Sequence, residues 1–174
     1  MQRIIPCARP LSIGASLVED GVCFAVFSRH GTRVFVCLFD EAGETELASL
    51  LLPCRDGDIH YGLLEGAGAG MRYGLRVEGP WQPERGHRFD PTKLLVDPYA
   101  TLIDRPFRWD PALARHGAET AALVPRCIVQ PLPVPGEVRA SEATPPTFLY
   151  ELGVRSFSMR HPAVPPPLRG TLVA

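Results

Sequence analysis

The stretch GVCFAVFSRHGTRVFVCLFD, residues 21–40, holds two apolar segments on either side of a short polar turn. Both segments, VCFAVFS (22–28) and RVFVCLFD (33–40), are rich in valine and phenylalanine, which favour strands. Neither alternates between apolar and polar residues, so each strand is expected to be covered on both of its faces. The turn at Arg29, His30 and Gly31 predicts that the two strands form a hairpin.

Further strands are predicted along the rest of the chain. The candidate segments are ETELASLLLP (44–53), IHYGLLEG (59–66), MRYGLRVEG (71–79) and CIVQ (127–130). On the second segment, Ile59, Tyr61 and Leu63 share one face. The third segment is expected to turn Met71, Tyr73, Leu75 and Val77 inward, and Arg72, Arg76 and Glu78 outward. Short strands with turn residues between them indicate an all-β sandwich.

The segment GPWQPERGHRFDPTKLLVDPYA, residues 79–100, has neither a helical nor a strand period. Its four prolines fix backbone angles, and its two glycines allow turns that other residues rarely adopt. We therefore expect an irregular loop rich in proline and aromatic residues, of the kind that often carries a binding or docking surface. A short helical excursion is expected in DPALARHGAETAALVP (110–125), with Asp110 as its cap and Pro111 at its first position.

Composition narrows the class of protein. The 18 basic and 19 acidic residues nearly cancel, which argues against a nucleic acid or an anionic membrane as the partner. The five cysteines are an odd number without a C-x-x-C pair, which favours reduced thiols in a cytoplasmic protein over disulfides or a metal site. No apolar run reaches the roughly 18 residues of a membrane span, and the N-terminal sequence lacks a signal-peptide core. No cofactor is predicted.

Three of these segments together carry a resemblance to a known family. Residues 21–40, the segment RYGLRVEGP (72–80) and the loop 79–100 resemble the N-terminal domain of bacterial glycogen debranching enzymes of the isoamylase type. In that family the domain is a carbohydrate-binding module of family 48, with an immunoglobulin-like early-set sandwich, followed by a catalytic barrel of glycoside hydrolase family 13. The resemblance covers residues 13–129 and therefore implies an immunoglobulin-like β-sandwich, in agreement with the strand pattern.

The C-terminal stretch TFLYELGVRSFSMRHPAVPPPLRGTLVA, residues 147–174, resembles the first strand of a family 13 barrel. The matching residues are Tyr150, Glu151, Phe157, His161, Pro162, Arg169, Gly170 and Thr171. Gly153 stands where the family has histidine, and Leu172 where it has an aromatic residue. One strand cannot form an eight-stranded barrel, so the fragment is expected to be disordered, to pack as an add-on, or to pair with another copy through its open edge.

The expected organisation is therefore an N-terminal arm (1–12), a β-sandwich (13–130), a proline-rich linker (131–146) and a barrel fragment (147–174).

Sugar binding needs an aromatic platform for the apolar face of a pyranose and polar groups for its hydroxyls. Trp81 is the first candidate platform, followed by Trp109 and Tyr61, and its expected polar neighbours are Gln82, Arg85 and Lys93. In the resembled enzymes the module packs against the barrel, which gives Trp81 an alternative reading as a packing residue. The interdomain surface that the resemblance implies consists of Phe89, Asp90, Pro91, Asp97, Pro98 and Tyr99. His87 and Arg88 are expected to anchor the loop.

Glycoside hydrolysis needs two carboxylates about 5–9 Å apart. The candidates are Asp56 with Asp58, Glu84 with Asp90, and Glu151. The first pair flanks Gly57 in a predicted turn. The second is expected to bridge to Arg85, Arg88 or Lys93. The resemblance places Glu151 on the first barrel strand and the catalytic carboxylates on later ones, so no catalytic residue is predicted and the chain alone is expected to be inactive.

The expected function is that of a non-catalytic, glucan-associated module of a debranching enzyme that hydrolyses α-1,6 O-glycosidic branch linkages in glycogen or limit dextrin. Its expected partners are an α-glucan, such as glycogen or a maltooligosaccharide, and the missing family 13 barrel. One alternative is a free-standing glucan-binding or regulatory module. Another is a protein-interaction domain whose loop 79–100 pairs with itself or with another chain.

Overall fold

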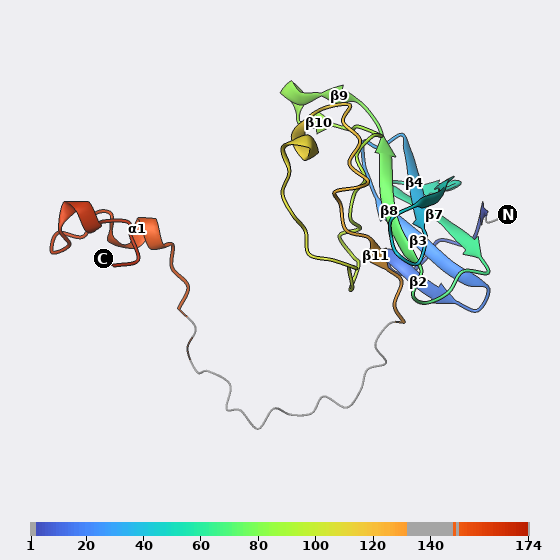
Figure 1. Cartoon of the computed structure of the whole chain (residues 1–174), viewed down its shortest axis with the longest axis horizontal. Helices are drawn as coiled ribbons and strands as arrows, with labels where there is room; N and C mark the ends of the chain where they lie inside the picture. Colours follow the sequence, from blue (N-terminus) through green and yellow to red (C-terminus); the bar gives the residue numbers. More distant parts are fainter. Residues whose placement is uncertain (1–2, 132–147, 149, 174) are drawn as a thin grey trace. The chain divides into compact units, whose positions relative to one another are not determined.

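The computed structural model describes residues 3–131, 148 and 150–173, and the chain divides into two units, Met1–Val134 and Pro135–Ala174. The strands of the first unit form two antiparallel sheets and a separate small hairpin (Figure 1). These strands are β1 (Ile4–Ile5), β2 (Gly14–Val18), β3 (Gly21–Phe27), β4 (Arg33–Phe39), β5 (Glu46–Leu51), β6 (Cys54–Asp56), β7 (Ile59–Glu65), β8 (Arg72–Glu78), β9 (Trp81–Gln82), β10 (His87–Arg88) and β11 (Cys127–Ile128).

The two sheets face each other across one hydrophobic core. One sheet has the order β1-β7-β3-β2, with β6 also paired to β7, and the other has the order β11-β8-β4-β5. The core combines residues of both sheets, and the rings of Phe24 on β3 and Tyr73 on β8 meet edge to face at 5.1 Å between centroids. The prediction of an all-β, immunoglobulin-like sandwich is therefore confirmed.

The predicted hairpin between the two apolar segments of residues 21–40 is wrong. Strand β3 pairs with β2 and β7, whereas β4 pairs with β5 and β8 in the other sheet. Each of the two strands lies in the interior of its own sheet, so the polar turn at Arg29, His30 and Gly31 carries the chain from one sheet to the other. The two ends of this turn bond to different sheets, because the Ser28 N–H donates to the Asp58 carbonyl next to β7 and the Thr32 N–H donates to the Glu78 carbonyl of β8.

A second apolar cluster explains why β4 is apolar on both faces. Cys37 and Phe39 point away from the main core and pack with Leu94 and Val124 from the chain segment that follows the small hairpin. This segment reaches the sheet closely, because a Cβ added to Gly74 of β8 would lie 2.8 Å from the Leu94 side chain. It also pairs with the part of the β8 edge that β11 leaves uncovered, since Leu75 and Leu95 exchange backbone hydrogen bonds of 2.8 and 2.9 Å. The segment thus forms a third layer over this sheet.

The alternation predicted for β8 agrees with the structure, in which Tyr73, Leu75 and Val77 are buried. On β7 the buried side chains are instead those of His60 and Leu64. Ile59, Tyr61 and Leu63 share the other, half-buried face of that strand.

The expected helical excursion is a single 3₁₀ turn, η2 (Pro111–Ala114), followed by turns up to residue 124. Asp110 caps it as predicted, because its Oδ1 accepts a hydrogen bond of 2.8 Å from the Ala112 backbone N–H. Among the described residues of the second unit there is one short helix, α1 (Val154–Ser158), one 3₁₀ turn, η3 (Pro166–Leu168), and no strand. The second unit therefore resembles a barrel strand only in its sequence. Most of the predicted linker 131–146 lies outside the described residues.

Candidate functional site

The small hairpin carries the residues predicted for sugar binding. Strands β9 and β10 are joined by the 3₁₀ turn η1 (Pro83–Arg85), which Gly86 closes with a φ of 82°. Arg88 lies opposite Trp81 and His87 opposite Gln82. Since successive strand residues point to opposite sides, Trp81 and Arg88 share one face of the hairpin, and Gln82 and His87 share the other. Sequence reasoning missed the pairing with Arg88 because the register became visible only in the folded hairpin.

Trp81 is held in place and is still accessible. Its side chain is 42% exposed, and its ring contacts the imidazole of His116 with 3.8 Å between centroids. His116 lies more than thirty residues further along the chain, just after the turn η2, and was not predicted as a site residue. Arg85 lies in the turn η1 and is exposed. The site therefore combines a positioned indole with guanidinium groups that face solvent.

Trp109, the second predicted platform, is 72% exposed. It borders a surface hollow of about 440 Å³ together with Arg105 and Arg108. Tyr61, the third predicted platform, is half-buried on β7. The two tryptophans thus belong to separate surface features of the same unit.

Lys93 has a different role from the predicted one. Its Nζ donates hydrogen bonds to the backbone carbonyls of Ala112, Arg115 and Ala118, at 2.9 Å for the first and 2.6 Å for the last. An ammonium group has three donors, so all of them are used within the chain. Lys93 therefore ties the loop to the turns around η2 and has no donor left for a sugar hydroxyl.

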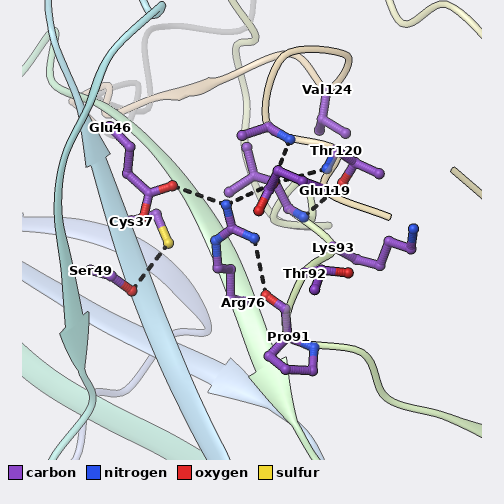
Figure 2. A network of polar contacts seen from close by, with 12 residues as sticks. Cys37, Glu46, Ser49, Arg76, Pro91, Thr92, Lys93, Glu119, Thr120 and Val124 are labelled. Atoms are coloured by element: carbon purple, nitrogen blue, oxygen red, sulfur yellow. Dashed lines mark hydrogen bonds and ion pairs between the residues drawn. The ribbon is translucent and has the colours of Figure 1, made fainter. Parts of the chain in front are cut away.

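Arg76 organises the base of the same loop, as Figure 2 shows. Its guanidinium donates to Glu46 at 3.0 Å, to Glu119 at 2.9 Å and to the Pro91 carbonyl at 3.0 Å. Burial alone would lower the pKa of Arg76, but the bonds to Glu119 and Glu46 outweigh it and raise this pKa. Arg76 on β8 thereby connects the edge strand β5, the loop 79–100 and the segment after η2.

Two aspartates of the predicted interdomain surface point inward. Asp90 is 6% exposed and accepts hydrogen bonds from Thr92 and from the Gly117 backbone N–H. Burial opposes its ionisation, but these bonds prevail and lower the pKa of Asp90. Asp97 is 3% exposed and accepts from the Tyr73 hydroxyl at 2.8 Å. Both side chains fix the loop to other parts of the first unit, because Asp90 bonds to Gly117 and Asp97 bonds to Tyr73.

The other members of the predicted interdomain surface divide into two groups. Phe89 is half-buried and packs against the main core. Pro91, Pro98 and Tyr99 are exposed, with Tyr99 at 57%. These three residues remain available to a partner.

Two apolar hollows, of about 480 and 490 Å³, both border the segment formed by Leu95 and Val96. The first is bordered by Phe27 and the second by Phe107, and these two side chains are 54% and 56% exposed. The first hollow is bordered in part by Phe89, Asp90 and Pro98 of the predicted interdomain surface, whereas the second hollow was not predicted. The apolar run LLV at 94–96 did not show that Leu94 would be buried and Leu95 exposed.

Three of the candidate carboxylates, those of Asp56, Asp58 and Asp90, have partners within the first unit. Asp56 is paired with Arg9 at 2.6 Å and Asp58 with Arg29 at 3.0 Å, all on the surface. Asp90 does not bridge to Arg85, Arg88 or Lys93, since its partners are Thr92 and Gly117. Within the residues that the structure describes, no cluster of three or more histidine, cysteine or acidic side chains could hold a metal ion. The same residues include no helix long and apolar enough to cross a membrane.

The family model of carbohydrate-binding module 48, the isoamylase N-terminal domain, matches residues 12–100, which include the small hairpin. The fold is also similar to part of the catalytic module of the multi-modular glycogen-degrading pneumococcal virulence factor SpuA, with 17% identity and a TM-score of 0.50. That match covers 70% of this chain and 16% of the other.

Two further structures have lower TM-scores. The pullulanase SAP of GBS in complex with maltotetraose is 18% identical with a TM-score of 0.45, and the match covers 70% of this chain and 14% of that one. The maltotriose complex of PulA from Klebsiella pneumoniae is 22% identical with a TM-score of 0.41, over 52% of this chain and 9% of that one. This chain therefore spans only a small part of the length of each of these proteins, and at such identities the likeness concerns the fold alone.

Proposed function

Because the chain belongs to the carbohydrate-binding module 48 family, we propose that its β-sandwich unit binds an α-glucan through the indole of Trp81. The observation that carries the proposal is the half-exposed ring of Trp81, backed by His116 on a hairpin inside the family match. A fixed aromatic face suits the apolar face of a pyranose and loses little entropy on binding. A neutral polymer also fits a chain whose charges nearly cancel.

The polar part of the site would come from two arginines. Arg88 lies on the same face of the hairpin as Trp81, and Arg85 lies in the adjoining turn. Guanidinium groups only donate hydrogen bonds, and sugar hydroxyls and ring oxygens can accept them. Gln82 points to the opposite side and Lys93 is engaged with carbonyls, so both are assigned to the support of the hairpin and loop.

The finer part of the proposal concerns the parent protein. We infer that this unit serves a cytoplasmic glycogen debranching hydrolase of family 13, which cleaves α-1,6 branch linkages, by holding the glucan near the catalytic barrel. The family description and the similar fold of part of the glycogen-degrading protein SpuA support this inference. Release of reducing ends from limit dextrin by this chain alone would contradict the assignment as a non-catalytic module.

The test is native affinity electrophoresis of the whole chain in gels with increasing glycogen. The wild type is expected to be retarded, and Trp81→Ala to lose most of the retardation. Trp109→Ala is the matched control, because it removes the other exposed indole of the same unit. Equal migration of wild type and Trp81→Ala at every glycogen concentration would refute the assignment of Trp81.

A second candidate function is docking to a partner domain, and the two apolar hollows beside Leu95 and Val96 favour it. The family 13 barrel is the expected partner. If this surface docks in trans, adding a separately produced barrel should give a complex in sedimentation experiments, and Leu95→Glu should abolish it. A complex that survives the substitution would place the contact elsewhere.

A further inference from the structure

Two thiols from distant parts of the sequence lie next to each other in the first unit. The sulfur of Cys7 is 3.6 Å from the sulfur of Cys23. Cys23 is on β3 and only 8% exposed, whereas Cys7 is half-buried and follows β1 in the N-terminal arm. All five cysteines are free thiols in this structure.

The strand register explains why these two residues meet. Ile5 pairs with Leu63, and Leu63 pairs with Cys23, so the three residues form one row across the sheet. The neighbours of Cys23, Val22 and Phe24, point into the main core. Cys23 therefore points to the outer face of the sheet, where the arm that leaves β1 brings Cys7 over it.

We propose that Cys7 and Cys23 are an oxidisable dithiol, a modification site at which a low-molecular-weight disulfide such as oxidised glutathione closes a bond that clamps the arm to β3. The proposal is independent of glucan binding. It is also compatible with reduced cysteines in a reducing compartment, because the bond forms only when such an oxidant is present.

The reaction balances as two successive exchanges. The Cys7 thiolate attacks one sulfur of oxidised glutathione, which gives a mixed disulfide and releases one glutathione. Cys23 then attacks the Cys7 sulfur, and the second glutathione leaves as a thiolate that takes up the Cys23 proton. Two protein thiols are thus oxidised to one disulfide while one glutathione disulfide is reduced to two thiols.

The accessibility of the two thiols sets the order of these steps. Cys7 is the member that a solute can reach. Burial raises the pKa of Cys23 to about 12, so this residue is a thiol at neutral pH and acts second, inside the mixed disulfide.

The arm can move enough to close the bond. A disulfide has an S–S distance of about 2.05 Å, so the sulfurs must approach by about 1.5 Å. Strand β1 is only two residues long. The arm's ion pairs, Arg3 with Glu65 and Arg9 with Asp56, are exposed and hold it weakly.

The test treats the whole chain with oxidised glutathione at neutral pH and maps the products by non-reducing peptide mass spectrometry. The expected product contains a peptide pair linked through Cys7 and Cys23, and two of the five thiols no longer react with Ellman's reagent in denaturant. Hydrogen exchange at the amide of β1 that faces β7 should slow by about tenfold or more, and dithiothreitol should reverse this change.

Two variants make the result decisive. Cys54→Ser is the matched control, since Cys54 on β6, which pairs with β7, is the other half-buried thiol. This variant should still form the bond between Cys7 and Cys23. Cys7→Ser should form no bond and show no change in exchange. A stable glutathione adduct on Cys7, a bond from Cys7 to Cys54, or full retention of both thiols would each overturn the proposal.

Discussion

Replacing Tyr73 by phenylalanine removes one hydroxyl from the buried joint between the sandwich and the loop 79–100. The Tyr73 hydroxyl donates to Asp97 Oδ2 at 2.8 Å, and the other carboxylate oxygen accepts from the Tyr99 backbone N–H at 2.9 Å. Tyr73 is 1% and Asp97 3% exposed, so the carboxylate loses this donor unless a water molecule enters the small cavity that borders Tyr73. Burial is the main reason that the pKa of Tyr73 is raised, which keeps the hydroxyl protonated as a donor.

The expected cost follows from the kind of bond that is lost. A buried hydrogen bond to a charged group contributes about 1.5–3 kcal/mol, and phenylalanine keeps the packing against Phe24. We therefore expect Tyr73→Phe to lower the free energy of unfolding by about 2 kcal/mol. For a unit of this size that corresponds to a fall of about 6 °C in Tm. Urea titrations followed by far-UV circular dichroism measure the first quantity, and thermal melts the second.

Tyr61→Phe is the matched control, because this tyrosine lies on the half-buried outer face of the other sheet. It should change the free energy of unfolding by about 0.5 kcal/mol or less. A double-mutant cycle of Tyr73→Phe with Asp97→Asn should give a coupling energy of about 1 kcal/mol or more, since the two side chains touch. Equal costs for the two tyrosine variants, or no coupling to Asp97, would refute the view that this bond holds the loop.

Three further predictions test other contacts. Burial lowers the pKa of His60 below 6.5, so the unfolded chain takes up the proton first as the pH falls, and stability should decrease as the pH is lowered through 6.5. His60→Gln should flatten this part of the urea-midpoint profile, and unchanged slopes would contradict it. In urea titrations, Arg76→Leu should lower the free energy of unfolding by about 1–3 kcal/mol. The control Arg33→Leu removes an exposed ion pair and should lower it by about 0–1 kcal/mol. Equal losses for the two variants would argue against the Arg76 network. Lys93→Met should lower the free energy of unfolding by about 1–3 kcal/mol and leave the retardation by glycogen unchanged. Arg85→Ala should leave the free energy of unfolding nearly unchanged and weaken the retardation. The opposite pattern would indicate that Lys93 binds the sugar.

Much of the candidate site was visible in the sequence at the level of its segment. The four prolines and two glycines of residues 79–100 exclude a long regular element, although the short hairpin β9–β10 forms within this segment. Trp81 and Arg85 stand out in it. The roles of single residues were less accessible. Lys93 and Asp90 look like surface charges in the sequence, but the segment from 110 to 120 returns to cover them and supplies their partners. The same segment, 110–120, also brings His116 into contact with Trp81.

The sequence by itself determined the all-β class of this protein and the strands β3, β4, β5, β7, β8 and β11. These follow from local composition and period, which act on neighbouring residues and need no knowledge of distant ones. The strands β1, β2 and β6 and the hairpin β9–β10 were not predicted. Tertiary structure alone decided that β3 and β4 lie in different sheets, that Leu94 and Val124 cover the outer face of β4, and that Cys7 meets Cys23. These outcomes depend on which distant segment pairs with each strand edge and which one covers each apolar face. Several segments of similar composition could do so, and the local sequence does not distinguish between them.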